Sequence, residues 1–235
     1  MSLVHPPTLS RHTTTLTNPS PYHRTYLGFI RLTKALSNYR TTNPSSPATF
    51  TLKLAPYQLY PDATQEGVNK YEWYKNEKYD GSEDRMNKYM AVMRDLGKQE
   101  GIEFDFGGGV VANTLHAHRV LQWLQNNKED GAALEAVKAL YMQYFEQRAH
   151  PSSRETLVKG CMAAGLGEEE AMKLVEDSDE GLRETKAAIR EQAGNGVDSV
   201  PYVVFEGRKR DFTLVGAKTV AEYEKVLGQV ARECT

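Results

Sequence analysis

The spacing of apolar residues changes twice along this chain. Apolar positions recur at helical spacing over residues 26–39, and an alternating stretch, residues 49–55, predicts a strand. From about residue 83 to residue 194 the spacing is helical, which predicts a long block of helices. The pattern then returns to alternation at residues 200–205 and 212–215. We therefore expect a hairpin there, followed by a closing helix.

This order places the strands of one small sheet on both sides of a long helical segment. The two groups of strands must meet to bury the apolar face of the sheet. We therefore predict an α/β fold with one discontinuous domain, formed by residues 26–82 and 195–232. Residues 83–194 would form a helical insert domain. Residues 62–82 are too polar to assign, and residues 1–25 are expected to be a poorly ordered or atypical N-terminal segment.

Three helix starts can be read from capping residues. Thr25 stands where it could cap the helix over residues 26–39. Asn113 or Thr114 opens the next helical stretch in the insert. Ser152 and Glu155 have the spacing of a capping box, which predicts a helix that starts directly after Ser152.

The charge balance excludes two classes of partner. The chain carries 29 Lys and Arg against 31 Asp and Glu, a net charge of −2, so it has no bulk attraction to nucleic acid or to an anionic membrane. No apolar run approaches the ~20 residues that a membrane-spanning helix needs. We expect neither nucleic acid nor a membrane as a partner.

The first part of the chain differs in composition from the rest. Residues 1–61 contain no acidic residue, and residues 1–25 are rich in Ser, Thr and Pro. Such a start is typical of an organelle transit peptide, although Arg11 is the sole arginine before Arg24. There is no apolar core of a secretory signal, and two cysteines suit a reducing compartment. We expect a cytoplasmic protein, with a mitochondrial location as the alternative.

The cysteines are placed unfavourably for shared chemistry. Cys161 and Cys234 are far apart, and no C-x-x-C sequence occurs. This excludes a disulfide-stapled scaffold and a Cys-rich zinc module, and we expect no metal and no cofactor. Cys161 lies in a helical apolar pattern and is expected to be a small core residue.

Two groups of motifs carry a resemblance to a known family. The first lies around the predicted hairpin and comprises Gly196, Val197, Val200, Pro201, Val204, Phe205, Gly216 and Ala217. The second lies at a helix start in the insert and comprises Asn113, Thr114, Ala117, His118 and Arg119. Together they resemble the DsbA-like thioredoxin-fold oxidoreductases of the FrnE type, over about residues 26–230. The resemblance implies a thioredoxin-like fold with a large all-helical insertion.

The same resemblance implies a site. The family has a cis peptide bond at the position of Val200 and Pro201, on a loop that faces the active site. It also implies a substrate cleft lined by these two residues together with Asn113, His118 and Arg119. For His118, a structural or cleft role is expected rather than acid–base catalysis.

The residues that perform the family's chemistry are absent. Family members carry C-P-W-C before the first helix, where the helix start lowers the pKa of the first thiol. Tyr26 and Gly28 match the residues that follow this motif, so the cysteine positions hold Tyr22 and Thr25. Neither can form a disulfide. We expect an impaired thiol–disulfide oxidoreductase whose family partners are protein or peptide thiols, with a non-catalytic peptide- or protein-binding pseudoenzyme as the alternative.

A further alternative rests on a second resemblance. Ser20-Pro21-Tyr22, followed by Leu27-Gly28-Phe29, is similar to S-P-Y-S-x-L-G-F of kappa-class glutathione transferases and 2-hydroxychromene-2-carboxylate isomerases, with two extra residues here. This resemblance implies a glutathione-dependent transferase or isomerase. Ser20 and Arg24 would then contact glutathione or another anion. The kappa class dimerises, and both a monomer and a homodimer stay open.

A misplaced exon boundary or reading frame upstream of Tyr26 would explain three features of the atypical start. These are the missing catalytic motif, the absence of acidic residues, and the absence of a convincing first strand, since residues 13–18 are a poor candidate. Loss of the active site during evolution would usually leave that strand intact, because the sheet needs it. Both explanations stay open.

Overall fold

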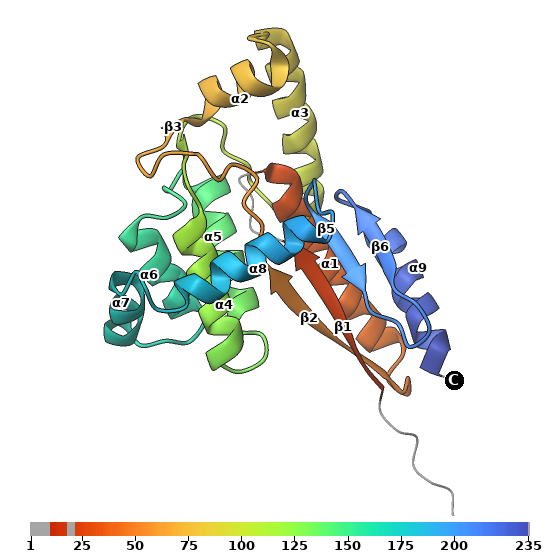
Figure 1. Ribbon diagram of the computed structural model, residues 1–235. Helices are drawn as coiled ribbons and strands as arrows, with labels where there is room; N and C mark the ends of the chain where they lie inside the picture. Colours follow the sequence, from red (N-terminus) through yellow and green to blue (C-terminus); the bar gives the residue numbers. More distant parts are fainter. Residues whose placement is uncertain (1–9, 18–21, 235) are drawn as a thin grey trace, which may run out of the picture.

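The fold is built on a four-stranded mixed sheet (Figure 1). The computed structural model describes residues 10–17 and 22–234. The strands lie in the order β2-β1-β5-β6, with β1 parallel to β2 and antiparallel to β5. Their bounds are β1 Ser10–Thr17, β2 Ala48–Ala55, β5 Tyr202–Phe205 and β6 Phe212–Val215. The two ends of the chain therefore meet in one sheet, and the predicted hairpin of β5 and β6 is confirmed.

The N-terminal strand corrects the sequence analysis. Residues 10–17 form β1, the second strand of the sheet, and Thr14 pairs with Leu52 on one side and with Phe205 on the other. Both Thr14 and Leu16 are fully buried. The strand was missed because half of its residues are threonines, so the segment shows no alternation of apolar and polar residues. Threonine is β-branched and suits a pleated strand nonetheless. The expected absence of this strand was wrong. In the predicted N-terminal segment, residues 1–9 and 18–21 lie outside the described residues.

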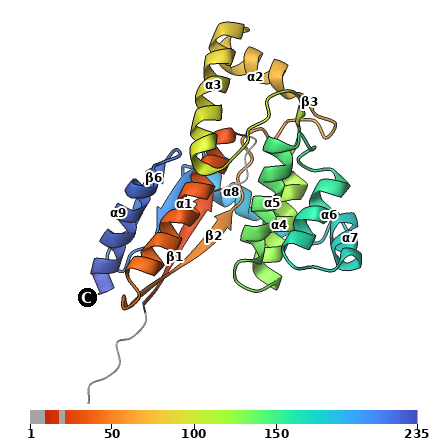
Figure 2. The ribbon, with the colours of Figure 1, turned by 180° about the vertical axis from the view of Figure 1, so that it is seen from behind.

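Two helices cover one face of the sheet. Figure 2 shows α1, His23–Thr42, and α9, Val220–Ala231, side by side in front of the strands. The apolar stripe of α9 is buried against this layer through Tyr223, Leu227 and Val230. The helix α1 starts at residue 23 with Tyr22 as its N-cap, three residues earlier than predicted, and Thr25 does not cap it.

The helices of the insert are α3 Glu83–Glu100, α4 Leu115–Asn127, α5 Ala132–Glu146, α6 Arg154–Ala163, α7 Glu168–Glu176 and α8 Leu182–Gly194. Of these, α4, α5 and α8 contact the edge strand β2, whereas α3 packs against α1. From α4, Gln122 and Gln125 hydrogen-bond the backbone of Leu54 in β2. These side chains satisfy backbone groups of an edge strand that would otherwise be open to pairing.

The unassigned stretch before the insert contains a helix. It is α2, Lys70–Tyr79, whose N-cap Asn69 accepts a hydrogen bond from the backbone N–H of Glu72. The short strands β3, Val68–Asn69, and β4, Val110–Val111, pair beside it. In Figure 1, α2 and α3 project beyond the end of the sheet at which α1 begins. The helical region thus begins near residue 70 and not at residue 83.

The predicted capping box at Ser152 is also corrected. The N-cap of α6 is Ser153, whose hydroxyl accepts a hydrogen bond from the N–H of Thr156 at 3.3 Å. Ser152 instead donates its hydroxyl proton to the carbonyl of Asn113 at 2.7 Å. Among the residues that the structure describes, we find no helix with the length and hydropathy needed to cross a bilayer.

Candidate functional site

The site is formed where the first turns of α1 meet the loop before β5. The peptide bond between Val200 and Pro201 is cis. Pro201 is buried against Gly28, where a Cβ atom on Gly28 would lie 2.8 Å from Cγ of Pro201. Only glycine permits so close an approach of helix and loop. The two elements that the resemblance placed at the site therefore do lie together.

Val200 stands at the end of the sheet and is partly exposed. The ladder between β5 and β6 begins one residue after Pro201, at Tyr202. Within the described part of the chain, the backbone N–H and C=O of Val200 make no hydrogen bond. An extended segment could pair with them in the manner of an added strand.

Tyr22 and Thr25 occupy the first turn of α1. The N–H of Thr25 donates to the carbonyl of Tyr22 at 2.9 Å, as expected at a helix start. The hydroxyl of Tyr22 hydrogen-bonds the hydroxyl of Tyr60, and burial together with this bond raises the pKa of Tyr22. The hydroxyl of Thr25 is buried without a hydrogen-bond partner among the described residues. Neither hydroxyl is ionised near neutral pH, and among the described residues neither is hydrogen-bonded to a basic side chain.

Arg24 lies in the same turn and is exposed. No acidic residue is present in the first turn of α1. The unpaired N–H groups and the dipole of the helix start, together with this guanidinium, favour an anionic group at the site. Ser20, the other predicted anion contact, lies outside the described residues.

His23 is a buried residue that sequence reasoning missed. Its ring stacks on Phe106 with centroids 4.5 Å apart, and Nδ1 lies 3.1 Å from the hydroxyl of Tyr89. Burial, and then the charge of Lys70, hold the pKa of His23 well below its usual range. His23 is therefore neutral at pH 7. Its side chain is 1% exposed, so it packs the start of α1 against the core and is not accessible to a ligand.

Lys70 is the cation that, after burial, contributes to the lowered pKa of His23. Its side chain is buried, and Nζ donates to the carbonyl of Tyr144 at 3.2 Å and lies 4.4 Å from the centre of the Tyr144 ring. The carbonyl belongs to the last turn of α5, which leaves its final carbonyls without helical partners. Burial lowers the pKa of Lys70 to about 8. The lysine thus stabilises the end of a helix while its charge is penalised by burial.

This lysine gives a pH dependence that can be measured. Since the folded-state pKa of Lys70, about 8, lies below the ordinary lysine value of 10.5, the unfolded chain binds more protons between these values and stability rises with pH. From pH 7 to pH 9.5, the free energy of unfolding of the natural protein should rise by about 2 kcal/mol relative to Lys70→Met. Urea titrations at both pH values test this, with Lys88→Met as a control for loss of an exposed lysine. A difference that does not change with pH would contradict the assignment.

The three cleft residues predicted from the insert are buried. Asn113 is buried, and it accepts from Gln58 at 3.1 Å and donates to the carbonyl of Pro61 at 2.8 Å. It therefore positions the loop after β2. His118 and Arg119 are fully buried, so neither side chain lines an open cleft, and for His118 this burial favours the structural alternative. The guanidinium of Arg119 binds carbonyls at the end of α7 and in the following turn, so its role is structural.

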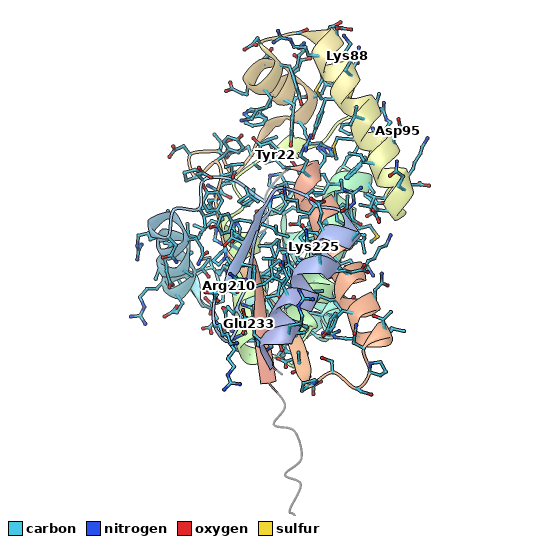
Figure 3. The ribbon with its side chains drawn as sticks, turned by 90° about the vertical axis from the view of Figure 1, so that its right-hand side faces the viewer. Tyr22, Lys88, Asp95, Arg210, Lys225 and Glu233 are labelled. Atoms are coloured by element: carbon cyan, nitrogen blue, oxygen red, sulfur yellow. The ribbon has the colours of Figure 1, made fainter. Side chains whose placement is uncertain are left out.

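The cysteines do not supply the missing chemistry. Cys161 is fully buried in α6, as predicted, and burial raises the pKa of its thiol to about 12. Cys234 lies in the 3-10 helix Arg232–Cys234. Its neighbour Glu233 accepts from the N–H of Lys209 in the turn between β5 and β6, at 2.7 Å. Figure 3 shows Glu233 and Tyr22 toward opposite ends of the molecule.

The described residues contain no group of three His, Cys, Asp or Glu side chains that could hold a metal ion.

Sequence reasoning also missed an aromatic group beside Tyr22, formed by Tyr60 and by Trp73 and Tyr74 of α2. The high density of aromatic residues in 71–79 and the capping residue Asn69 were the signals that could have found it.

The comparisons with known proteins agree on one fold. A family model described as a DSBA-like thioredoxin domain matches residues 20–228. A probable DsbA oxidoreductase from Streptomyces coelicolor has a TM-score of 0.80 at 20% identity, with 95% of this chain and 92% of that chain covered. A 2-hydroxychromene-2-carboxylate isomerase has a TM-score of 0.66 at 13% identity, with 94% and 97% covered. The cytosolic disulfide reductase DsbM from Pseudomonas aeruginosa, in a structure with GSH, has a TM-score of 0.55 at 15% identity, with 94% of this chain and 99% of that chain covered. No curated protein matches the chain.

Proposed function

Because this chain belongs to the DSBA-like thioredoxin domain family, whose thiol oxidoreductases act on thiol or disulfide substrates, we propose that it is a non-redox member that binds an extended peptide or protein segment. The observation that carries the proposal is the pair Tyr22 and Thr25 at the cysteine positions, beside a retained loop at Val200 and Pro201. This site can pair with a backbone but has no thiol to exchange. The FrnE-type assignment within the family stays a prediction.

Three features support the loss of thiol exchange. Exchange requires a thiolate that reaches a disulfide. The thiol of Cys161 is buried and protonated at neutral pH. The hydroxyl of Tyr22 is bound to Tyr60, and that of Thr25 is enclosed. Each of these groups is unsuited to attack a disulfide.

Two features support retained binding. Gly28 still permits the close contact between α1 and Pro201, which fixes the loop. The backbone N–H and C=O of Val200 have no partner among the described residues, so an extended chain can add main-chain hydrogen bonds to them. Such recognition depends little on sequence, because both partners use backbone atoms.

The test combines binding and redox assays. Fluorescence anisotropy with fluorescein-labelled, carboxamidomethylated insulin B chain, which has no free thiol, should show saturable binding. Val200→Pro removes the N–H and should weaken binding roughly threefold to tenfold, whereas Val200→Thr keeps it and should bind as the natural protein does. Insulin reduction by dithiothreitol should not be accelerated. Accelerated reduction, or binding that Val200→Pro leaves unchanged with the fold intact, would refute the proposal.

A glutathione-dependent transferase or isomerase is the second candidate. The observation that favours it is exposed Arg24 in a helix start that lacks acidic residues, a suitable place for a carboxylate of glutathione. DsbM, the disulfide reductase reported above, was solved with GSH. Calorimetric titration with glutathione decides between the candidates, since absence of binding removes the second one.

A further inference from the structure

A second hollow lies next to the candidate site. It is a pocket of about 470 Å³ between the loop that follows β2 and the helix α2. Its apolar wall is made by Tyr60, Trp73, Val68 and Val111, and Val68 is 48% exposed. We refer to it as the aromatic pocket. Two carboxylates, those of Asp62 and Glu77, also line it.

A cation already lies over the rings at the margin of this pocket. The ammonium group of Lys78 lies 5.2 Å from the centre of the Tyr60 ring, 5.6 Å from that of Tyr22 and 5.7 Å from that of Trp73. Such distances are those of cation–π attraction, in which the electron-rich ring faces bind a positive charge. Lys78 is exposed and stands in the last turn of α2, so it can move away from the rings.

The carboxylates of the pocket are available to a ligand. Asp62 and Glu77 are exposed, and neither forms an ion pair with a described residue. They add negative potential to the same hollow that Tyr60 and Trp73 line. An ammonium or guanidinium group would be attracted there, and a carboxylate would be repelled.

The aromatic pocket is continuous with the candidate site. The hydroxyls of Tyr22, at the start of α1, and Tyr60, in the pocket wall, are hydrogen-bonded to each other. A few residues further along α1, Gly28 lies against Pro201. The first turns of α1 therefore connect the Val200–Pro201 loop with the pocket. A segment bound at Val200 can extend a side chain along them.

We propose that the aromatic pocket selects a basic side chain, lysine or arginine, of the segment that binds at the Val200–Pro201 loop, and that this side chain displaces Lys78 from the rings. This inference rests on the proposed peptide-binding function and names the specificity of that site. Lys78 acts as an internal competitor, because it offers the rings the same kind of cation that the ligand brings.

The first experiment tests the pocket without a peptide. Titration with n-butylammonium, with n-butanol as the neutral probe, is followed by the NMR signal of the Trp73 indole N–H, assigned from Trp73→Leu. Saturable shifts are expected from the cation alone. Lys78→Ala should tighten its binding roughly twofold to fivefold, while Lys88→Ala, which removes the same charge from α3, should not. Equal effects of the two variants, or equal shifts from the neutral probe, would overturn the proposal.

The second experiment tests selection within a bound segment. Labelled ten-residue peptides that differ only in a central lysine, norleucine or glutamate are compared by anisotropy. The lysine peptide should bind roughly threefold to tenfold tighter than the norleucine peptide, and the glutamate peptide most weakly. The double substitution Asp62→Asn, Glu77→Gln should reduce this preference, as should high salt.

The outcomes separate this inference from the proposed function. If all peptides bind equally and Val200→Pro weakens them, the peptide site stands and the basic pocket is wrong. If no peptide binds, the proposed function is wrong, and the selection argued here is wrong with it. A shift of Trp73 by n-butylammonium would then be that of a small-cation site only.

Discussion

Replacing Tyr22 and Thr25 with cysteine is expected to give a protein that catalyses disulfide reduction in insulin, which the natural protein should not do. The two residues lie in the first turn of α1, where the N–H of Thr25 donates to the carbonyl of Tyr22 at 2.9 Å. Two thiols placed there stand three residues apart, and the first lies at a helix start. A thiol whose pKa falls from about 8.5 to about 7 carries roughly fifteenfold more thiolate at neutral pH.

The assay follows insulin turbidity with dithiothreitol, and activity should exceed that of the single variant Tyr22→Cys by roughly tenfold or more, because that variant has no resolving thiol. The matched control is Tyr22→Ser with Thr25→Ser, which also removes the hydrogen bond to Tyr60. Thiol titration and circular dichroism establish that the dithiol variant is folded and redox-competent. A folded, reducible variant without turnover would mean that the site beside Pro201 no longer receives a disulfide substrate.

Substitution of Arg119 by leucine is expected to lower the free energy of unfolding by about 3–5 kcal/mol. The guanidinium is fully buried and donates to the carbonyls of Leu174 at 3.0 Å, Val175 at 3.2 Å and Glu180 at 3.0 Å. Leucine would leave these carbonyls without their donor and would not fill the same volume.

Urea unfolding followed by circular dichroism measures this loss. Arg119→Lys keeps a donor but lacks the planar fork that reaches several carbonyls, so an intermediate loss is expected. Arg183→Leu, at an exposed ion pair with Glu184 on α8, is the control and should change stability by less than about 0.5 kcal/mol. If Arg119→Leu lowered the free energy of unfolding no more than this control does, the hydrogen bonds to α7 would not be important for stability.

The general architecture could be predicted from the sequence, and the family match and solved structures agree with the predicted α/β, thioredoxin-like fold. The hairpin, α9 and the helical block are strongly periodic segments. Two elements escaped because their patterns are atypical. The strand β1 is rich in threonine and has a single leucine, Leu16, while α2 buries little more than Tyr74 and Lys70 and has a weak apolar stripe.

The site could be predicted in part. The meeting of α1 with Pro201, and the two replaced cysteine positions, follow from motifs along the chain. The complete burial of His118 and Arg119 could not be predicted from their motif, because a motif does not specify which face of a helix is covered by later segments. Arg119 is enclosed by α7 and the turn after it, more than fifty residues further on. The aromatic pocket depends on α2 and was therefore missed with it.

The strand order has a consequence for synthesis on the ribosome. The strand β1 pairs with β2 soon after both emerge, because α1 alone connects them. Its other edge must wait for β5, which begins at Tyr202, after the whole helical insert has been made. At about 5–20 residues per second, that edge stays open for roughly ten seconds or more. The nascent chain therefore carries an unpaired strand edge while its insert folds, and it is most exposed to chaperones and to aggregation in this interval.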